Sequence, residues 1–355
     1  MECNLPFSRG PFRGFPVPWA AISLGVIALV IASGTGFAQS CTTQAEMPPS
    51  SRTALQSAAM QMAQQIAAGN TAAIQSSIAP QVTAQAAGIL SSVATATPQV
   101  KAANFIVRNI YILDATDNAP SSAPTQFFCG SMNQPPHVIF SLGGLQKGSY
   151  AIAMVDANAV AQPQQMTMIF AQANASTTAA PNSPSASQWK LAGFAFKPTA
   201  IAGHDGLWYW KQARIYSQNK QNWNAYFYYT TAQYLLVPVS FVSSSNLNKL
   251  LREENAAKPA GLPGKQPMQL ANGTEKFSIT DIHTDGSLGG LDLIIRYAVQ
   301  NVQDPVATRR QNIAVMHLML QDHPELRQAF HGLWVYAVAP GQDPFGIELP
   351  MSQIP

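Results

Sequence analysis

The sequence predicts an α+β protein in which helices come first and short strands follow. Three observations support this fold class. Apolar residues recur at helical spacing between residues 52 and 93, and short strand-like segments follow over 105–196. A dense aromatic segment then precedes a second mixture of strands and helix. We therefore expect N-terminal helices on a curved antiparallel sheet, an aromatic helical hairpin, and a C-terminal ββαββ module.

The first 38 residues have the pattern of a removable export signal. Two arginines precede an apolar run over 19–32, which is short for a membrane span and typical of a signal-peptide core. Gly36 and Ala38 supply the small residues expected before a cleavage site. The pattern predicts a signal peptide over 1–38, an extended lead-in over 39–51, and an exported protein, periplasmic or secreted.

The overall composition disfavours two classes of partner. Charged residues make up 10% of the chain and the net charge is +3, too weak a field to gather nucleic acid. No segment after the leader has 18 consecutive apolar residues, so we expect no transmembrane helix. Phosphate-binding and dinucleotide-binding motifs are missing from the sequence, and we expect no cofactor.

Cysteine usage agrees with export. The chain has 3 cysteines, and Cys3 would leave with the leader. Cys41 and Cys129 then form an even pair in an oxidising compartment, which predicts a disulfide. The alternative is that Cys41 carries a lipid anchor. The preceding residues 38–40 (Ala-Gln-Ser) fit a lipoprotein signal poorly, so we favour the disulfide.

The first domain is expected over 52–198. Leu55, Ala59, Met62 and Ile66 share one helical face. The strand candidates that follow are Phe105–Leu113, Gln126–Met132, His137–Leu142, Ser149–Asp156, Gln165–Ala173 and Trp189–Phe196.

Two short motifs link this domain to a known superfamily. Ala67-Ala68-Gly69-Asn70 lies between the opening helices, and Trp189-Lys190-Leu191-Ala192-Gly193-Phe194 forms the closing strand. With this order of elements, residues 52–198 resemble the NTF2-like (cystatin-like) superfamily. The resemblance implies helices packed across a curved sheet with a cone-shaped pocket. It assigns no chemistry, because the superfamily includes enzymes, binding proteins and structural modules.

The next segment, over 199–255, is unusually aromatic. Residues 208–234 contain ten of the 32 aromatic residues in the chain. The pattern resembles one tetratricopeptide unit, which implies two closely packed antiparallel helices. The residues that carry this resemblance are Ala213, Tyr216, Ala225, Tyr229, Ala232 and Pro238.

Aromatic side chains in this segment are candidates for ligand binding. Tryptophan and tyrosine combine large apolar faces with a polar tip, which suits stacking on a glycan or lining a peptide groove. The alternative, which we favour, is that they pack the hairpin against its neighbours. The candidate ligand-binding residues are Trp208, Trp210, Trp223, Tyr226 and Tyr228.

A linker is expected over 256–275, because its first part is rich in proline and glycine. The C-terminal module over 276–355 follows. Its expected elements are strand Lys276–His283, strand Leu291–Gln300, helix Val306–Leu320, strand Leu333–Ala339 and strand Phe345–Leu349.

Asp281, His283 and Asp285 are the candidate metal ligands of this module. Alternate residues of a strand project to the same face, so the three side chains offer two carboxylates and one imidazole. A carboxylate beside a histidine also suits general-base chemistry. The alternative, which we favour, is the polar end of a strand that enters an Asp285-Gly286 hairpin turn.

The function expected from these features is non-catalytic. We expect an exported binding or assembly module for a small apolar ligand, a glycan or a protein partner. The alternative is a cell-envelope hydrolase or metal-dependent enzyme that uses the Asp-His-Asp group. Convergent polar side chains in one site would favour the enzyme, and an exposed aromatic surface would favour binding.

Overall fold

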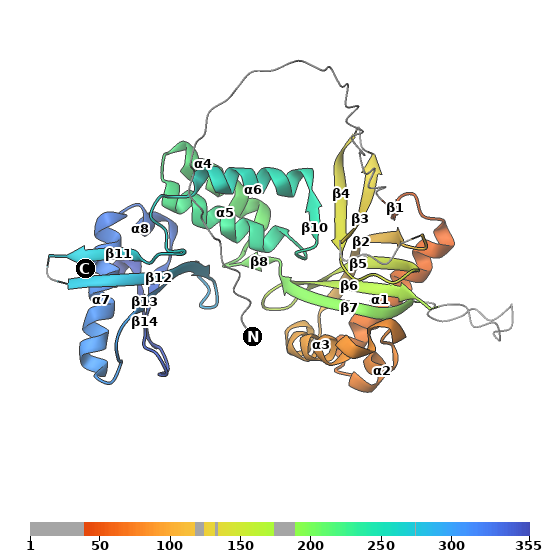
Figure 1. Ribbon diagram of the computed structural model, residues 1–355, viewed down its shortest axis with the longest axis horizontal. Helices are drawn as coiled ribbons and strands as arrows, with labels where there is room; N and C mark the ends of the chain where they lie inside the picture. The colour runs from red at the N-terminus through yellow and green to blue at the C-terminus, as the bar shows by residue number, and fades with distance from the viewer. Residues whose placement is uncertain (1–38, 118–123, 132–133, 174–188, 274) are drawn as a thin grey trace, which may run out of the picture. The chain divides into compact units, whose positions relative to one another are not determined.

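The computed structural model describes residues 39–117, 124–131, 134–173, 189–273 and 275–355 (Figure 1). Within these ranges the chain is α+β, as the sequence predicts. Its strands form an eight-stranded sheet, a five-stranded sheet and a two-stranded hairpin. The predicted signal peptide over 1–38 lies outside the described residues.

The elements alternate between helical and strand-rich stretches. Those of the first part are β1 (Gln39–Thr43), α1 (Pro49–Ala67), α2 (Thr71–Ser76), the 3-10 helix η1 (Pro80–Gln85), α3 (Ala86–Val100), β2 (Asn104–Asp114), β3 (Thr125–Ser131), β4 (Gln134–Leu142), β5 (Ser149–Asn158), β6 (Gln164–Gln172) and β7 (Trp189–Pro198). Those of the second part are β8 (Ala200–Ile201), β9 (His204–Asp205), α4 (Gly206–Gln218), α5 (Asn222–Leu236), β10 (Val242–Ser244), α6 (Ser245–Ala257), β11 (Met268–Asn272), β12 (Glu275–Asp285), β13 (Asp292–Ala298), α7 (Pro305–Asp322), α8 (Leu326–Ala329), β14 (Gly332–Val338), β15 (Phe345–Pro350) and the 3-10 helix η2 (Met351–Gln353).

The eight-stranded sheet has the order β10-β4-β3-β1-β2-β5-β6-β7. Strands β1 and β3 are parallel, and the other neighbours are antiparallel. The extended lead-in expected over 39–51 therefore contains a central strand of the sheet, and α1 already begins at Pro49. This strand is not recognisable in the sequence, because the five residues Gln-Ser-Cys-Thr-Thr show no apolar alternation.

Strand β5 of the eight-stranded sheet is buried on both of its faces. In β5, Ala151 and Ala153 belong to a core that helices α1 and α3 cover. Ile152 and Met154 point to the opposite face, into a second core with Phe127 of β3. A strand that is buried on both sides needs a nearly continuous apolar run, which the sequence of β5 supplies.

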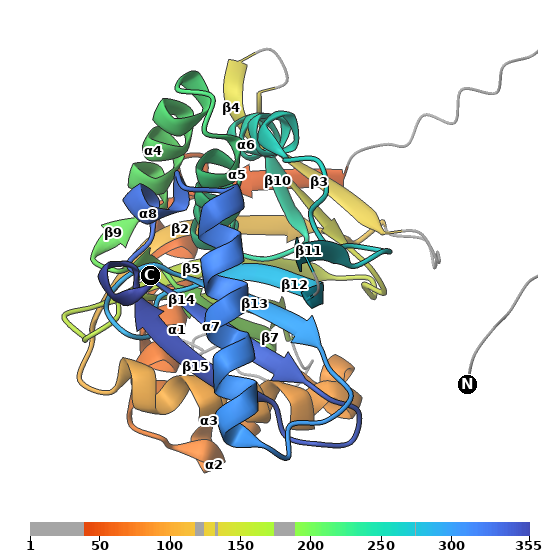
Figure 2. The same cartoon turned by 90° about the vertical axis from the view of Figure 1, so that its left-hand side faces the viewer.

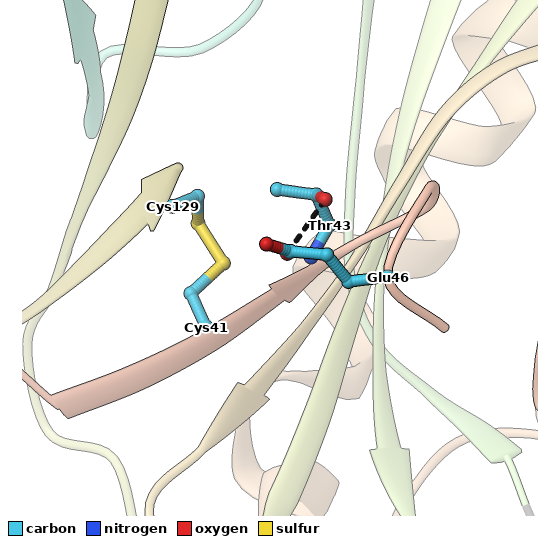
Figure 3. Close-up of a disulfide and its surroundings, with 4 residues drawn as sticks. All are labelled: Cys41, Thr43, Glu46 and Cys129. Carbon is cyan, nitrogen blue, oxygen red and sulfur yellow. Dashed lines mark hydrogen bonds between the residues drawn. A yellow bond between two sulfur atoms is a disulfide. The ribbon is translucent and has the colours of Figure 1, made fainter. Parts of the chain in front are cut away.

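A disulfide joins Cys41 of β1 to Cys129 of β3, which confirms the predicted pair (Figure 3). The two Cα atoms are 4.9 Å apart and the residues are separated by 88 positions. In the chain-entropy model, closing a loop of this length stabilises the folded state by about 4.5 kcal/mol. The disulfide thus fixes the N-terminal strand within the sheet.

Helices α4 and α5 form the aromatic hairpin. The side chain of Asp205 accepts a hydrogen bond from the backbone N–H of Trp208 at 2.8 Å, which caps the start of α4. Gly206 permits close contact between the helices, since a Cβ atom there would lie 2.6 Å from Cγ of Leu236. The buried side of the hairpin shares one core with the five-stranded sheet.

The five-stranded sheet has the order β11-β12-β13-β14-β15, and α7 lies along one face of it (Figure 2). Strands β13 and β14 are parallel, and α7 and α8 form the connection that a parallel pair requires. Part of the linker expected over 256–275 is strand β11, which pairs with β12. In β11, Leu270 is buried and Met268 packs against the same core, so the strand has a short apolar signal of two residues.

Candidate metal centre

The aromatic candidates lie mainly in the core. Trp210, Trp223 and Tyr228 are each less than a tenth exposed and belong to the core shared with the five-stranded sheet. The hydroxyl of Tyr228 donates a hydrogen bond to the carbonyl of Ala329 at 2.6 Å. The indole N–H of Trp210 donates to Glu253 at 2.7 Å. The three residues are therefore packing residues, and the polar tips of Trp210 and Tyr228 have hydrogen-bond partners.

The other two aromatic candidates are half-buried. Trp208 and Tyr226 pack against the same core from its margin. The exposed imidazole of His204 stacks on Trp208 with ring centroids 3.6 Å apart. A side chain of the protein thus already covers one face of the indole of Trp208.

The predicted metal ligands on β12 do not form a common site. His283 Nδ1 lies 2.6 Å from Asp281 Oδ2, and both side chains are 48% exposed. Asp285 accepts hydrogen bonds from the backbone N–H and the hydroxyl of Ser287, in the turn after the strand. The structure therefore shows an exposed acid–histidine pair and, beyond it, an aspartate engaged in a turn.

A different group of three side chains converges in the same sheet. Asp292 begins β13, His331 immediately precedes β14, and Glu348 lies on β15. One potential ligand atom from each residue lies within 4.8 Å of the other two. We call these three residues the acidic trio.

Strand pairing explains this convergence. The parallel ladder places Leu293 opposite Leu333, so the preceding residues Asp292 and Gly332 lie side by side. The antiparallel ladder between β14 and β15 places Glu348 opposite Trp334, near the same end of the sheet. Three strands thus bring residues distant in sequence to one point.

Gly332 forms the floor of the trio. A Cβ atom built on this residue would lie 2.9 Å from Glu348 Oε1 and 3.1 Å from Asp292 Oδ1. It would also lie 2.7 Å from the backbone carbonyl of Leu349. The two carboxylates therefore converge above a position where any side chain other than hydrogen would collide with them.

The trio holds more negative charge than its hydrogen bonds neutralise. Asp292 is buried, and burial is the largest influence that raises the pKa of its carboxyl. His331 Nδ1 lies 3.0 Å from Asp292 Oδ1, and the hydrogen bond between them acts in the opposite direction. Neither carboxylate has a lysine or arginine partner among the ion pairs of the described ranges.

Two buried oxygen atoms of the trio lack any hydrogen-bond donor. They are Asp292 Oδ2 and Glu348 Oε1. A buried acceptor without a partner costs about 1–3 kcal/mol, and an unpaired buried charge costs more. A bound cation would remove this cost by neutralising both carboxylates at once.

The ligand set defines which cations fit. One imidazole and two carboxylates suit Zn²⁺, Mn²⁺ or Fe²⁺ better than the all-oxygen sites that Ca²⁺ prefers. The side chain of His331 is 49% exposed, so solvent reaches one side of the trio. A metal held by these three residues would keep a position for water.

Sequence reasoning did not identify the trio, because its members stand 39 and 17 positions apart (331 − 292 and 348 − 331). The sequence does contain one signal. Asp292 interrupts the apolar run that makes β13, where an aspartate is unexpected unless it has a partner. Its partners, however, are set by strand order and register.

Comparison of the chain with protein-family models, curated proteins and solved structures found no match. The resemblances to the NTF2-like superfamily and to a tetratricopeptide unit therefore stay predictions. No helix within the described ranges is long and apolar enough to cross a membrane.

Proposed function

We propose that the protein is an exported binding module whose ligand is a divalent metal ion held by Asp292, His331 and Glu348. Two features support export. They are the signal-like leader over 1–38 and the disulfide. This proposal keeps the binding role expected from the sequence and replaces the aromatic hairpin as its site.

The observation that carries the proposal is that the carboxylate of Asp292 is buried and incompletely hydrogen-bonded. Its side chain is 1% exposed, its Oδ2 atom has no hydrogen-bond partner, and a second carboxylate lies within ligand distance. A buried ion pair is an adequate explanation for one carboxylate beside a histidine. It does not account for Glu348, whose buried Oε1 atom is also unpartnered.

A metal-dependent hydrolase is the second candidate, favoured by the exposure of His331. A metal bound by three protein ligands and open to solvent lowers the pKa of its bound water, which makes a hydroxide available near neutral pH. Metal-stimulated hydrolysis of an activated ester such as p-nitrophenyl acetate, absent in Asp292→Asn, would support this candidate over simple binding.

The test is metal titration of the purified protein. The protein is stripped with EDTA and dialysed, and ZnCl₂ or MnCl₂ is added while heat and the melting temperature are recorded. We expect one equivalent of metal to bind and to raise the melting temperature. Asp292→Asn and Glu348→Gln should each weaken binding by on the order of 100-fold, since each replaces a charged carboxylate ligand by a neutral amide. Binding should also weaken at acid pH, because the imidazole ligand must be neutral.

Asp281→Asn is the matched control, because it alters an aspartate that contacts a histidine in the same sheet. We expect wild-type metal affinity in this variant. The proposal is wrong if the folded wild-type protein binds neither metal stoichiometrically at micromolar concentration. It is also wrong if Asp292→Asn and the control bind equally well.

A further inference from the structure

Strand β1 occupies an unusual place for the first strand of the described chain. It lies inside the eight-stranded sheet, between β2 and β3, which are consecutive strands of the chain. Cys41, Thr42 and Thr43 pair with β2 in antiparallel fashion, and Gln39 and Ser40 pair with β3 in parallel fashion. Two strands that would otherwise be neighbours are thus separated by a third.

Strand β1 is held mainly by its backbone pairing with β2 and β3, because its side chains are little buried. None of its five residues is fully buried, and Ser40 is exposed. Two local links hold the strand, one at its middle residue Cys41 and one at its last residue Thr43 (Figure 3). The disulfide fixes Cys41 to β3, and Glu46 accepts hydrogen bonds from the backbone N–H and the hydroxyl of Thr43 at 2.9 and 2.7 Å.

In the strand order of the sheet, β2 and β3 are connected through β1. Without β1, the facing edges of β2 and β3 would present unpaired N–H and C=O groups in the middle of the sheet. Such edges pair readily with any extended segment that fits. The segment that fits this slot in length, register and cysteine position is residues Gln39–Thr43 themselves, and every other copy of the chain carries the same segment.

We propose that the slot between β2 and β3 is a strand-exchange site whose partner is a second copy of this chain. A dithiol reductant converts the Cys41–Cys129 disulfide into two thiols and is itself oxidised to a disulfide. Strand β1 then leaves its slot, with residues 44–48 as the hinge, and enters the slot of another copy. Oxidised glutathione, reduced to two thiols, next closes Cys41 of one copy onto Cys129 of the other.

Isotope mixing tests this proposal without altering the strand. Equal amounts of ¹⁴N-labelled and ¹⁵N-labelled protein are mixed, reduced with dithiothreitol, concentrated and reoxidised with oxidised glutathione. Both copies carry Cys3→Ser, so that Cys41 and Cys129 are the remaining cysteines. We expect a disulfide-linked dimer on a non-reducing gel. Its Cys41–Cys129 peptides, analysed by mass spectrometry, should include the mixed-isotope pair.

Two controls give the result its meaning. A mixture that is never reduced should yield single-isotope peptides, because the disulfide keeps each strand in its own slot. A pair of single-cysteine copies, Cys41→Ala and Cys129→Ala, should form a hetero-dimer joined through Cys41 and the buried Cys129, in excess of either homodimer. Thr42→Pro in the copy that keeps Cys41 should suppress the hetero-dimer, since proline is excluded from central strands.

Two outcomes would overturn the proposal. One is that every Cys41–Cys129 peptide after reoxidation carries a single isotope. The other is that the single-cysteine copies give homodimers and hetero-dimer in the statistical ratio, which would indicate random thiol collision. Far-ultraviolet circular dichroism of each variant confirms that it is folded before mixing.

Discussion

The five-stranded sheet carries two acid–histidine groups that differ in almost every physical respect. Asp281 and His283 stand two positions apart on one strand, touch each other, and are half exposed. Asp292, His331 and Glu348 come from three strands, and their central carboxylate is 1% exposed. Water contacts both side chains of the exposed pair. The acidic trio has buried oxygen atoms that water does not reach.

This difference shows why short spacing is a poor guide to a metal site. Two charged groups in water interact weakly and need no third partner. Two buried carboxylates repel each other unless a cation or a proton neutralises them. Carboxylates therefore need a neutralising partner when they are buried. Burial depends on the pairing of strands that are distant in sequence, so a short motif does not reveal it.

The largest effect in this comparison is expected from Gly332→Ala, which fills the floor of the trio. The added methyl would lie 2.7 Å from the carbonyl of Leu349 and 2.9 Å from Glu348 Oε1, so β15 must shift. We expect the free energy of unfolding in urea to fall by about 3 kcal/mol and metal binding to be lost. Gly264→Ala is the control, because a Cβ there meets nothing within 4 Å. Equal stability of the two variants would show that the trio is not tightly built.

A smaller effect is expected in how the free energy of unfolding of the metal-free protein depends on pH. Burial raises the pKa of Asp292 above its ordinary value of 3.8, so the folded state holds this proton more tightly than the unfolded chain. The contribution of Asp292 to the free energy of unfolding is therefore most favourable below pH 3.8 and declines as pH rises through its folded-state pKa. In EDTA, Asp292→Asn should show a shallower decline toward neutral pH than wild type, whereas Asp281→Asn should stay within about 0.5 kcal/mol of wild type.

Urea unfolding between about pH 4 and pH 7 measures this difference. At neutral pH, metal-free Asp292→Asn should be at least as stable as metal-free wild type, because the cost of burying the charged carboxylate is gone. Parallel curves for the wild type and Asp292→Asn would contradict the electrostatic account of the trio.

The smallest effect is expected at the exposed pair. Breaking it with Asp281→Asn should lower the free energy of unfolding by about 0.5 kcal/mol at low ionic strength, at a pH where histidine is charged. The loss should vanish in about 0.5 M NaCl, because salt screens charges in water. Urea unfolding at both salt concentrations measures it, and a loss above about 2 kcal/mol would mean that this pair is not merely a surface contact.

Much of the fold follows from local pattern. The two apolar runs of β2, the continuous apolar run of β5 and the cap at Asp205 are signals within a few residues of the elements they specify. Strands β1 and β11 cannot be predicted from local pattern, because each has few or no buried side chains. Both are held by backbone hydrogen bonds to neighbouring strands.

The candidate site illustrates the same limit of local pattern. The disulfide was predictable, since after loss of the leader two cysteines remain and have one possible pairing. The acidic trio depends instead on which strands are neighbours and in which register, and Gly332 matters because of the atoms above it. Those facts are properties of the assembled sheet.

The central position of β1 also affects the order in which the protein can be built. Residues 39–43 are synthesised early, yet their partners Phe127 and Phe128 follow 88 positions later. The strand can pair with β2 once residues 111–113 have been made, but its pairing with β3 must await residues 127 and 128. Such long-range pairing slows folding, because distant segments must meet before the contacts form. We therefore expect closure of the eight-stranded sheet to be a late event during export, completed when the disulfide forms.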